Sequence, residues 1–444
     1  MRKLLIASMA LISGGSLSAQ DTTRVPVGVR LEAVYTVGKR PLIAVRPVSA
    51  TPDQAQAGQQ ISSILERDLD YSDRFEIAPT PSALAAGTVD YQLWNSLRVI
   101  YVIASDLMAT ASGYELTVTA HDVPYTKTKE SRAFSLPQAS APGFRMAVHA
   151  VSDEIVRWLT DRPGAAASRI AVARNGPRGS ELLLVDSDGE NVQRVLSSQH
   201  WIYSPALSPD GRKIAYSQRL ASGKIELRER DLTTNSDRVI SNRSIIAFTP
   251  AYSPDGKRLA FSFAIGNGTE IHEFDLERGG TPRRLTNTQH TDGAPTYSPD
   301  GSRIAFHSNR FGNNHVFMSS TSGGGNPVAL SPIGVGRVKF TAPDWSPTGD
   351  EIVISGESKG GFHLMILNAA RPQSATQITE TGINEDPTWA PDGRHIAYTG
   401  VGREGAGLYV IDKTTGRTRR VLAGDHLKMA EWSGRLAGAT SAGN

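Results

Sequence analysis

One four-residue motif recurs through the second half of the chain at nearly constant spacing. Ser-Pro-Asp-Gly begins at positions 208, 253 and 298, and degenerate copies, Ser-Pro-Thr-Gly and Ala-Pro-Asp-Gly, begin at positions 346 and 390. The starts are 45, 45, 48 and 44 residues apart. A period of roughly 40–50 residues is typical of β-propellers, in which each repeat forms one four-stranded blade. The motif itself favours a tight turn, because Pro fixes φ and Gly accepts the positive φ that closes the turn.

The residues around each turn alternate as strands do. A large-small-large run follows each turn, as in Ile214-Ala215-Tyr216 and Leu259-Ala260-Phe261. A Gly-containing hairpin, a third apolar run such as Ile225-Glu226-Leu227 and a shorter fourth run such as Val239-Ile240 complete the unit. Alternation with period two places bulky and small side chains on opposite faces of a sheet. We therefore expect four strands in each repeat.

The repeat array does not begin and end in phase. Ile170-Ala171-Val172 matches a second strand, 44 residues before Ile214, but no turn motif precedes it. At the other end, Glu431-Trp432-Ser433 resembles Asp344-Trp345-Ser346, but no further blade follows. The sequence predicts six blades over residues 169–434, one of them with an inner strand from about Lys428 to Ser433. Such a ring has no free sheet edge.

The amino terminus has the pattern of an export signal. Arg2 and Lys3 precede the apolar run Leu4 to Ile12, and small residues reach Ala19. This run is too short to span a bilayer, so we expect a cleaved signal peptide over residues 1–19 and an exported mature protein. The chain contains no cysteine, which excludes disulfides and thiolate chemistry.

The segment between the signal and the repeats mixes strands with helices. Leu42 to Val45 and Val99 to Ala104 are typical of buried strands. Apolar residues recur at helical spacing over about 53–71 and 142–160. We expect a small α/β domain over residues 20–162, a linker over 163–168 and a tail over 435–444.

Charge and motifs give little support for other functions. Removal of Arg2 and Lys3 would leave 45 basic against 44 acidic residues, so no electrostatic argument favours nucleic acid or an anionic membrane surface. Gly356 to Gly360 fits the Gly-x-Ser-x-Gly pattern of hydrolases, but it falls in a hairpin with no helix after it. The histidines are scattered and show no zinc-ligand spacing, so we assign no metal or cofactor. An exported propeller hydrolase and a metal-dependent carbohydrate lyase remain as alternatives.

The order of export signal, α/β domain and aromatic-Ser-Pro-Asp-Gly propeller resembles the TolB family, periplasmic components of the Tol-Pal envelope system of Gram-negative bacteria. The segments Arg40 to Val45, Ile64 to Leu69 and Asp153 to Val156 carry the resemblance further. The chain departs from the family at its end, where Trp432-Ser433 continues into Gly434 rather than Pro. The resemblance implies an all-β six-bladed β-propeller with TolB- or WD-like repeats after the α/β domain. It also implies a monomeric, non-enzymatic adaptor located in the periplasm.

The resemblance further implies two protein partners. The propeller would bind Pal, the peptidoglycan-associated lipoprotein of the outer membrane, in support of envelope integrity and outer-membrane constriction during cell division. The mature amino-terminal segment, about residues 19–29, would engage the inner-membrane protein TolA. The residues of this segment that we expect to make the contact are Thr22, Thr23, Arg24, Val25 and Val27.

Propeller geometry indicates where a partner would dock. Loops that enter the inner strands converge on one rim around the central channel, so we expect residues just before those strands to line the docking surface. The candidates are Trp201, Ser204, Thr249, His290, Ala294, Thr341, Glu385 and Asp386. His290, Ala294 and Thr341 are singled out because their segments are similar to loops of the family that contact Pal.

Overall fold

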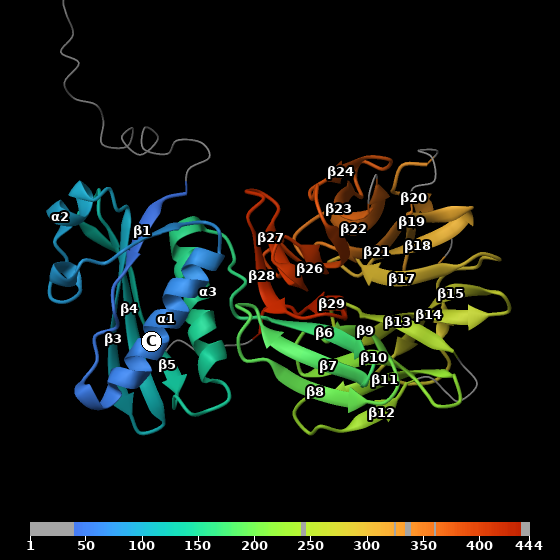
Figure 1. The fold of residues 1–444 in the computed structure, drawn as a ribbon, viewed down its shortest axis with the longest axis horizontal. Helices are drawn as coiled ribbons and strands as arrows, with labels where there is room; N and C mark the ends of the chain where they lie inside the picture. The colour runs from blue at the N-terminus through green and yellow to red at the C-terminus, as the bar shows by residue number, and fades with distance from the viewer. Residues whose placement is uncertain (1–39, 241–245, 324–325, 334–338, 359–360, 437–444) are drawn as a thin grey trace, which may run out of the picture.

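An α/β unit and a ring of β-sheets lie side by side in the structure, a computed structural model (Figure 1). It describes residues 40–436 apart from 241–245, 324–325, 334–338 and 359–360. The expected signal peptide and amino-terminal contact segment lie outside the described residues. No helix of the described part is long and apolar enough to cross a membrane.

The α/β unit is built on one five-stranded sheet with strand order β2-β1-β3-β4-β5. Strand β1 pairs in parallel with β2 and β3, and the remaining pairs are antiparallel. The strands are β1 (Leu42–Val45), β2 (Glu76–Ala78), β3 (Tyr101–Thr110), β4 (Gly113–Asp122) and β5 (Lys127–Pro137). The helices are α1 (Ala55–Tyr71), α2 (Tyr91–Ser96) and α3 (Phe144–Thr160), with short 3-10 turns at Pro52–Gln54 and Ser82–Leu84.

Helices α1 and α3 cover one face of this sheet and lie between it and the ring (Figure 1). Their apolar positions recur at helical spacing, as in Ile61, Leu65 and Leu69 of α1, and all three side chains are fully buried in one core with Val148 and Ile155 of α3. The opposite faces of the two helices therefore remain available for contact with the ring.

The described part of the ring contains six four-stranded sheets, which confirms the expected six-bladed propeller after an α/β domain. In each blade the first strand lies nearest the channel. The blades are β9 (Ile202–Leu207), β10 (Lys213–Arg219), β11 (Ile225–Asp231), β12 (Asp237–Val239); β13 (Ala247–Tyr252), β14 (Arg258–Ile265), β15 (Gly268–Asp275), β16 (Arg283–Arg284); β17 (Asp292–Tyr297), β18 (Arg303–Phe311), β19 (Asn313–Ser320), β20 (Val328–Ala329); β21 (Phe340–Trp345), β22 (Glu351–Ser358), β23 (Gly361–Asn368), β24 (Ala375–Gln377); β25 (Ile383–Trp389), β26 (His395–Gly402), β27 (Gly405–Asp412), β28 (Thr418–Ala423); and the closing blade β29 (Leu427–Trp432), β6 (Arg169–Gly176), β7 (Gly179–Asp186), β8 (Gln193–Ser198).

The closing blade joins the two ends of the array, as the phase of the repeat predicts. Strand β29 pairs antiparallel with β6, and Trp432 lies opposite Ile170. The Trp432 indole donates to Ser168 Oγ at 2.7 Å, and the backbone amide of Arg169 donates to Ser433 Oγ at 3.0 Å. Residues more than 250 positions apart are thus held in one sheet.

The Ser-Pro-Asp-Gly turns are held by the side chains of their own Ser and Asp. Ser208 Oγ donates to Asp210 Oδ1 at 2.6 Å and accepts the amide of Lys213 at 2.9 Å. Asp210 Oδ1 also accepts the amide of Arg212, and Gly211 adopts φ +66°. The motif aspartates therefore cap backbone amides, as residues of this kind do in turns.

Candidate partner-binding site

A channel runs along the propeller axis and encloses a cavity of about 480 Å³. Residues of all six inner strands, β9, β13, β17, β21, β25 and β29, line it. The connections that enter the inner strands and those between second and third strands lie at one end of the channel, because strand direction alternates within a blade. We call this end the channel mouth.

Each inner strand is interrupted by a bulge at the same position. There a non-glycine residue adopts positive φ, and in five of the six strands a proline follows it. These residues, with their φ values, are Ser204 (42°), Thr249 (50°), Ala294 (47°), Ala342 (48°), Asp386 (51°) and Met429 (58°). Such a conformation costs roughly 1–2 kcal/mol for a residue other than glycine, and strain of this kind clusters at functional sites. Its repetition around one channel marks the mouth as a candidate site.

Hydrogen bonds between adjacent blades support this strained ring. The amide of Ala294 donates to Thr249 Oγ1 at 3.3 Å, and the amide of Met429 donates to Asp386 Oδ2 at 2.9 Å. The amide of Ser204 in turn lies 3.1 Å from the Met429 sulfur. A side chain at the bulge of one blade thus accepts a hydrogen bond from a backbone amide of the next blade, and these bonds fix the shape of the mouth.

The channel wall carries three half-buried carboxyl groups, Asp344, Asp386 and Glu431. Burial raises the pKa of Asp344 to about 6, although its Oδ2 accepts the amide of Trp389 at 2.7 Å. Burial and the charge of Asp344 raise the pKa of Glu431 well above its ordinary value. Burial likewise raises the pKa of Asp386. These carboxyl groups therefore keep their protons to higher pH than carboxyl groups in water do.

Exposed apolar side chains surround the mouth. They lie in connections or at strand ends at this end of the ring and are between 44% and 57% exposed. The members of this apolar collar are Trp201, Ile246, Ile265, Phe311, Ile383 and Val401. Apolar side chains gathered around a concave opening are typical of a surface that binds another protein.

Comparison with known proteins places this architecture in a family. A family model described as the TolB beta propeller domain matches residues 156–436, which is more than half of the chain. A second model, the TolB amino-terminal domain, matches residues 29–128. The chain belongs to the TolB family.

Individual members of the family show the same relationship. The chain is 32% identical over 198 residues to the Tol-Pal system protein TolB of Albidiferax ferrireducens, covering 44% of this chain and 46% of the relative. It is 30% identical over 234 residues to the protein of that name from an Anaeromyxobacter species, covering 51% of each. The chain thus spans about half the length of these curated relatives. The crystal structure of TolB from Acinetobacter baumannii matches with a TM-score of 0.77 at 25% identity, over 89% of this chain and 97% of that one.

The candidate rim residues do not all lie where the sequence suggests. Ser204, Thr249, Ala294 and Asp386 line the channel, but they lie inside the inner strands rather than before them. The reason is the bulge, because its left-handed residue turns the strand locally without ending it. The other candidates lie around this ring. Trp201 and the exposed His290 precede β9 and β17, Thr341 directly precedes Ala342 in β21, and Glu385 pairs with Lys428 of β29.

Sequence reasoning missed the collar residues at hairpin tips. Ile265, Phe311 and Val401 lie at or near the ends of β14, β18 and β26, in hairpins that look like simple glycine turns. A large apolar residue next to the turn glycine, as in Ile265-Gly266 and Phe311-Gly312, is the available signal. One such residue is not unusual, but several gathered at one end of the ring are typical of a surface that another protein covers.

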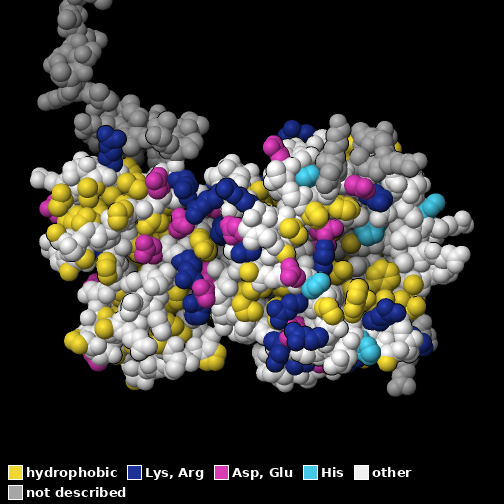
Figure 2. All heavy atoms as spheres, in the orientation of Figure 1, with side chains coloured by type: hydrophobic (Ala, Val, Ile, Leu, Met, Phe, Trp, Pro, Cys, Tyr) yellow, Lys and Arg dark blue, Asp and Glu magenta, His cyan; other side chains and the backbone are white. Residues whose placement is uncertain are grey.

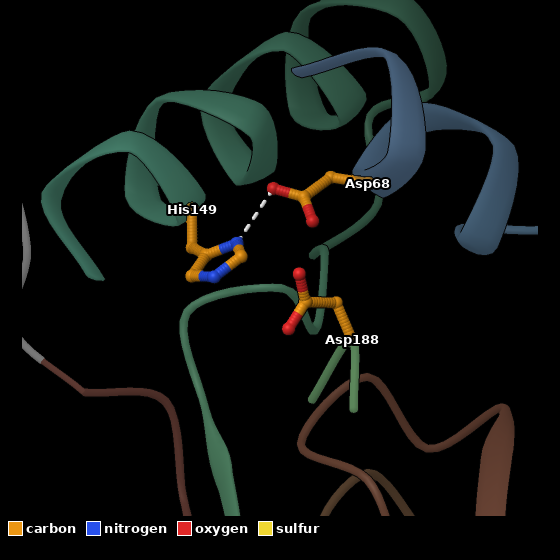
Figure 3. Close-up of side chains that lie close together, drawn as sticks. All are labelled: Asp68, His149 and Asp188. Carbon is orange, nitrogen blue, oxygen red and sulfur yellow. Dashed lines mark hydrogen bonds and ion pairs between the residues drawn. The ribbon is translucent and has the colours of Figure 1, made fainter. Parts of the chain in front are cut away.

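Two buried groups of side chains resemble metal sites but carry their own counter-charges. Asp68, His149 and Asp188 point toward one another between α1, α3 and the propeller (Figure 3), with ligand atoms within 4.8 Å of one another. However, Arg145 Nη2 lies 2.6 Å from Asp188 Oδ2, and Arg67 Nη1 lies 3.2 Å from the same atom. A cation would face these guanidinium groups, so we interpret the cluster as an ion-pair network. The second group, Asp73, His395 and Asp412, is likewise neutralised, with Arg394 Nη2 2.6 Å from Asp412 Oδ2.

Proposed function

We propose that the chain is a non-enzymatic periplasmic adaptor of the Tol-Pal system. In this proposal the channel mouth binds a Pal-like peptidoglycan-associated lipoprotein of the outer membrane. The amino-terminal segment binds a TolA-like inner-membrane protein. The adaptor would act as a monomer in envelope integrity and in outer-membrane constriction during division. Family membership supports this assignment.

The apolar collar is the observation that carries the proposal. It lies at the end of the propeller where the chain enters the inner strands. The α/β unit contacts turns at the other ends of the strands, toward which the cavity extends from the bulges. A partner could therefore cover the collar without displacing the α/β unit. Core apolar contacts within a polar rim are the usual anatomy of a protein interface.

Photo-cross-linking from the collar tests the proposal. We expect p-benzoylphenylalanine in place of Phe311 to form an adduct with the soluble domain of the Pal-like lipoprotein from the same bacterium. The same group at Ala370 is the control, because Ala370 is exposed in the connection between β23 and β24 at the opposite end of the ring. Adducts from position 370 but not from position 311 would place the interface elsewhere.

The amino-terminal segment is proposed as the second contact on sequence grounds. Thr22, Thr23, Arg24, Val25 and Val27 combine two β-branched pairs with few apolar anchors, a composition that suits strand addition to a partner's sheet. We expect a chain that starts at Arg30 to lose binding to the TolA-like domain while it keeps binding to the Pal-like domain. Surface plasmon resonance with both domains measures this. Unchanged TolA-like binding by the shortened chain would contradict the assignment.

A further inference from the structure

The α/β unit and the propeller meet along a seam rich in charge, where basic and acidic side chains gather at the junction (Figure 2). Arg145 Nη2 lies 2.6 Å from Asp188 Oδ2 across this seam. Asp73, fully buried two residues after the end of α1, has carboxylate oxygens 2.9 Å from Arg417 Nη1 and 3.0 Å from Arg419 Nη1 of the propeller. Contacts between the two units therefore depend strongly on charge, so the seam is sensitive to any of its side chains whose charge changes with pH.

His395 of the propeller is one such side chain. Its ring is buried, with Nδ1 2.7 Å from Asp392 Oδ2 in its own blade and Nε2 3.2 Å from Asp73 Oδ2 in the α/β unit. Only the doubly protonated ring can donate to both carboxylates. Burial opposes the charged ring, but the charge and hydrogen bond of Asp392 and the hydrogen bond of Asp73 outweigh it and raise the pKa of His395.

His149 of α3 is the second buried histidine at the seam, and it lies beside Asp68 and Asp188 (Figure 3). Its ring is fully buried, and Nδ1 lies 2.8 Å from Asp68 Oδ2 of α1. Nε2 has no hydrogen bond but lies 3.9 Å from Asp186 Oδ2 of the propeller. Burial opposes the charged ring, but the carboxylates of Asp68, Asp188 and Asp186 together raise the pKa of His149.

The remaining charged groups at the seam come from every element packed against the two imidazole rings. Around His395 they are Asp73, Arg74, Asp392, Arg394, Asp412, Arg417 and Arg419, and around His149 they are Arg67, Asp68, Arg145, Asp153, Arg169, Asp186 and Asp188. Interactions that outweigh burial lower the pKa values of Asp73, Asp188, Asp392 and Asp412, so these groups stay ionised near neutral pH. Asp153 is the exception, because burial raises its pKa to about 6.

We propose that the seam is a pH-sensitive latch, in which protonated His149 and His395 hold the α/β unit against the propeller and loss of their protons loosens it. The direction of the pH effect follows from the linkage between proton binding and docking of the two units. Only the part of each pKa rise that comes from carboxylates across the seam, from Asp73 for His395 and from Asp186 and Asp188 for His149, depends on docking. That part stabilises the docked state fully below the pKa of the undocked histidine, and it is lost as pH rises through the docked pKa. Protonation of Asp153 acts in the same direction but below about pH 6. The latch concerns the chain alone and depends on no partner.

Distance measurements between spin labels test the latch. The chain has no cysteine, so Gln92→Cys in α2 and Ser222→Cys in the β10–β11 hairpin, both exposed, provide two unique attachment sites. At a urea concentration that leaves the circular dichroism signal of the folded chain unchanged, we expect the population of separated units to grow between pH 6.5 and 9. The logarithm of the separation constant should rise by up to about one unit per pH unit for each histidine that releases a proton.

Glutamine variants test whether the two histidines act through their charge or only through packing. His149→Gln and His395→Gln singly should each remove part of the pH response, and the double variant should remove it and resemble the unsubstituted chain at high pH. NMR titration of the two imidazoles in the unsubstituted chain provides a second measurement, which does not require any variant to fold. The proposal is overturned by a distance distribution that ignores pH, by a pH response that survives in the double variant, or by imidazoles that titrate at or below the ordinary histidine value.

Discussion

Deletion of residues 428–444 is expected to destabilise the whole propeller rather than only the closing blade. The deletion removes most of β29, including Trp432, which is buried in one core with Ile170 and Val172 of β6. Loss of a buried tryptophan alone costs about 3–5 kcal/mol, and the deletion also leaves the inner edge of β6 unpaired. For a domain of this size, we expect the melting temperature to fall by at least about 10 °C, or the cooperative transition to disappear. Differential scanning calorimetry measures either result.

Two variants define what the closing strand contributes. Deletion of residues 437–444 alone keeps two contacts: Arg435 lies 3.2 Å from Asp153 of α3, and the Leu436 amide donates to the Ala167 carbonyl. This shortened chain should therefore melt at nearly the same temperature as the full chain. Trp432→Ala keeps the backbone of β29 and should show an intermediate loss. Equal melting of the full chain and the chain that ends at residue 427 would show that closure by β29 does not stabilise the ring.

The blade structure could be predicted because its signals are local. The turn motif is held by bonds within six residues, such as Arg258 N to Ser253 Oγ at 3.0 Å, so a short window of sequence specifies the hairpin. The closing blade was also predictable, because Trp432-Ser433 repeats the phase of Trp345-Ser346. The left-handed bulges were not expected, since no glycine marks them. The recurring pair of a bulge residue and proline, as in Thr249-Pro250, is the signal that indicates them.

The seam could not be predicted, because its contacts join residues far apart in the chain. Asp73 and His395 are separated by 322 positions, and charged residues in turns ordinarily face solvent. The degenerate repeat offers a partial signal. Ala390 replaces the motif serine, so Asp392 lacks its usual serine partner and accepts His395 Nδ1 instead. In this blade the departure from the repeat coincides with contact to the α/β unit.

Ala294→Arg is expected to weaken binding of the Pal-like domain strongly, with little effect on folding. Ala294 is half-buried at the strained ring of the channel mouth and already tolerates positive φ, so the new residue adopts the same backbone. Asp344, whose pKa of about 6 leaves it ionised at neutral pH, should attract the guanidinium and keep the long side chain in the channel. A charge at the desolvated centre of an interface costs about 2 kcal/mol or more, which corresponds to at least about a thirtyfold loss of affinity.

Ala370→Arg is the matched control. It introduces the same side chain at the opposite end of the ring, where Ala370 is exposed after β23. A surface substitution of this kind should change stability by no more than about 0.5 kcal/mol and should leave the mouth open.

Isothermal titration of these two variants and the unsubstituted chain with the soluble Pal-like domain tests most directly whether the channel mouth is the partner-binding site. The account predicts equal affinity for the unsubstituted chain and Ala370→Arg, and at least about a thirtyfold weaker affinity for Ala294→Arg at an unchanged melting temperature. Full affinity in folded Ala294→Arg would contradict it.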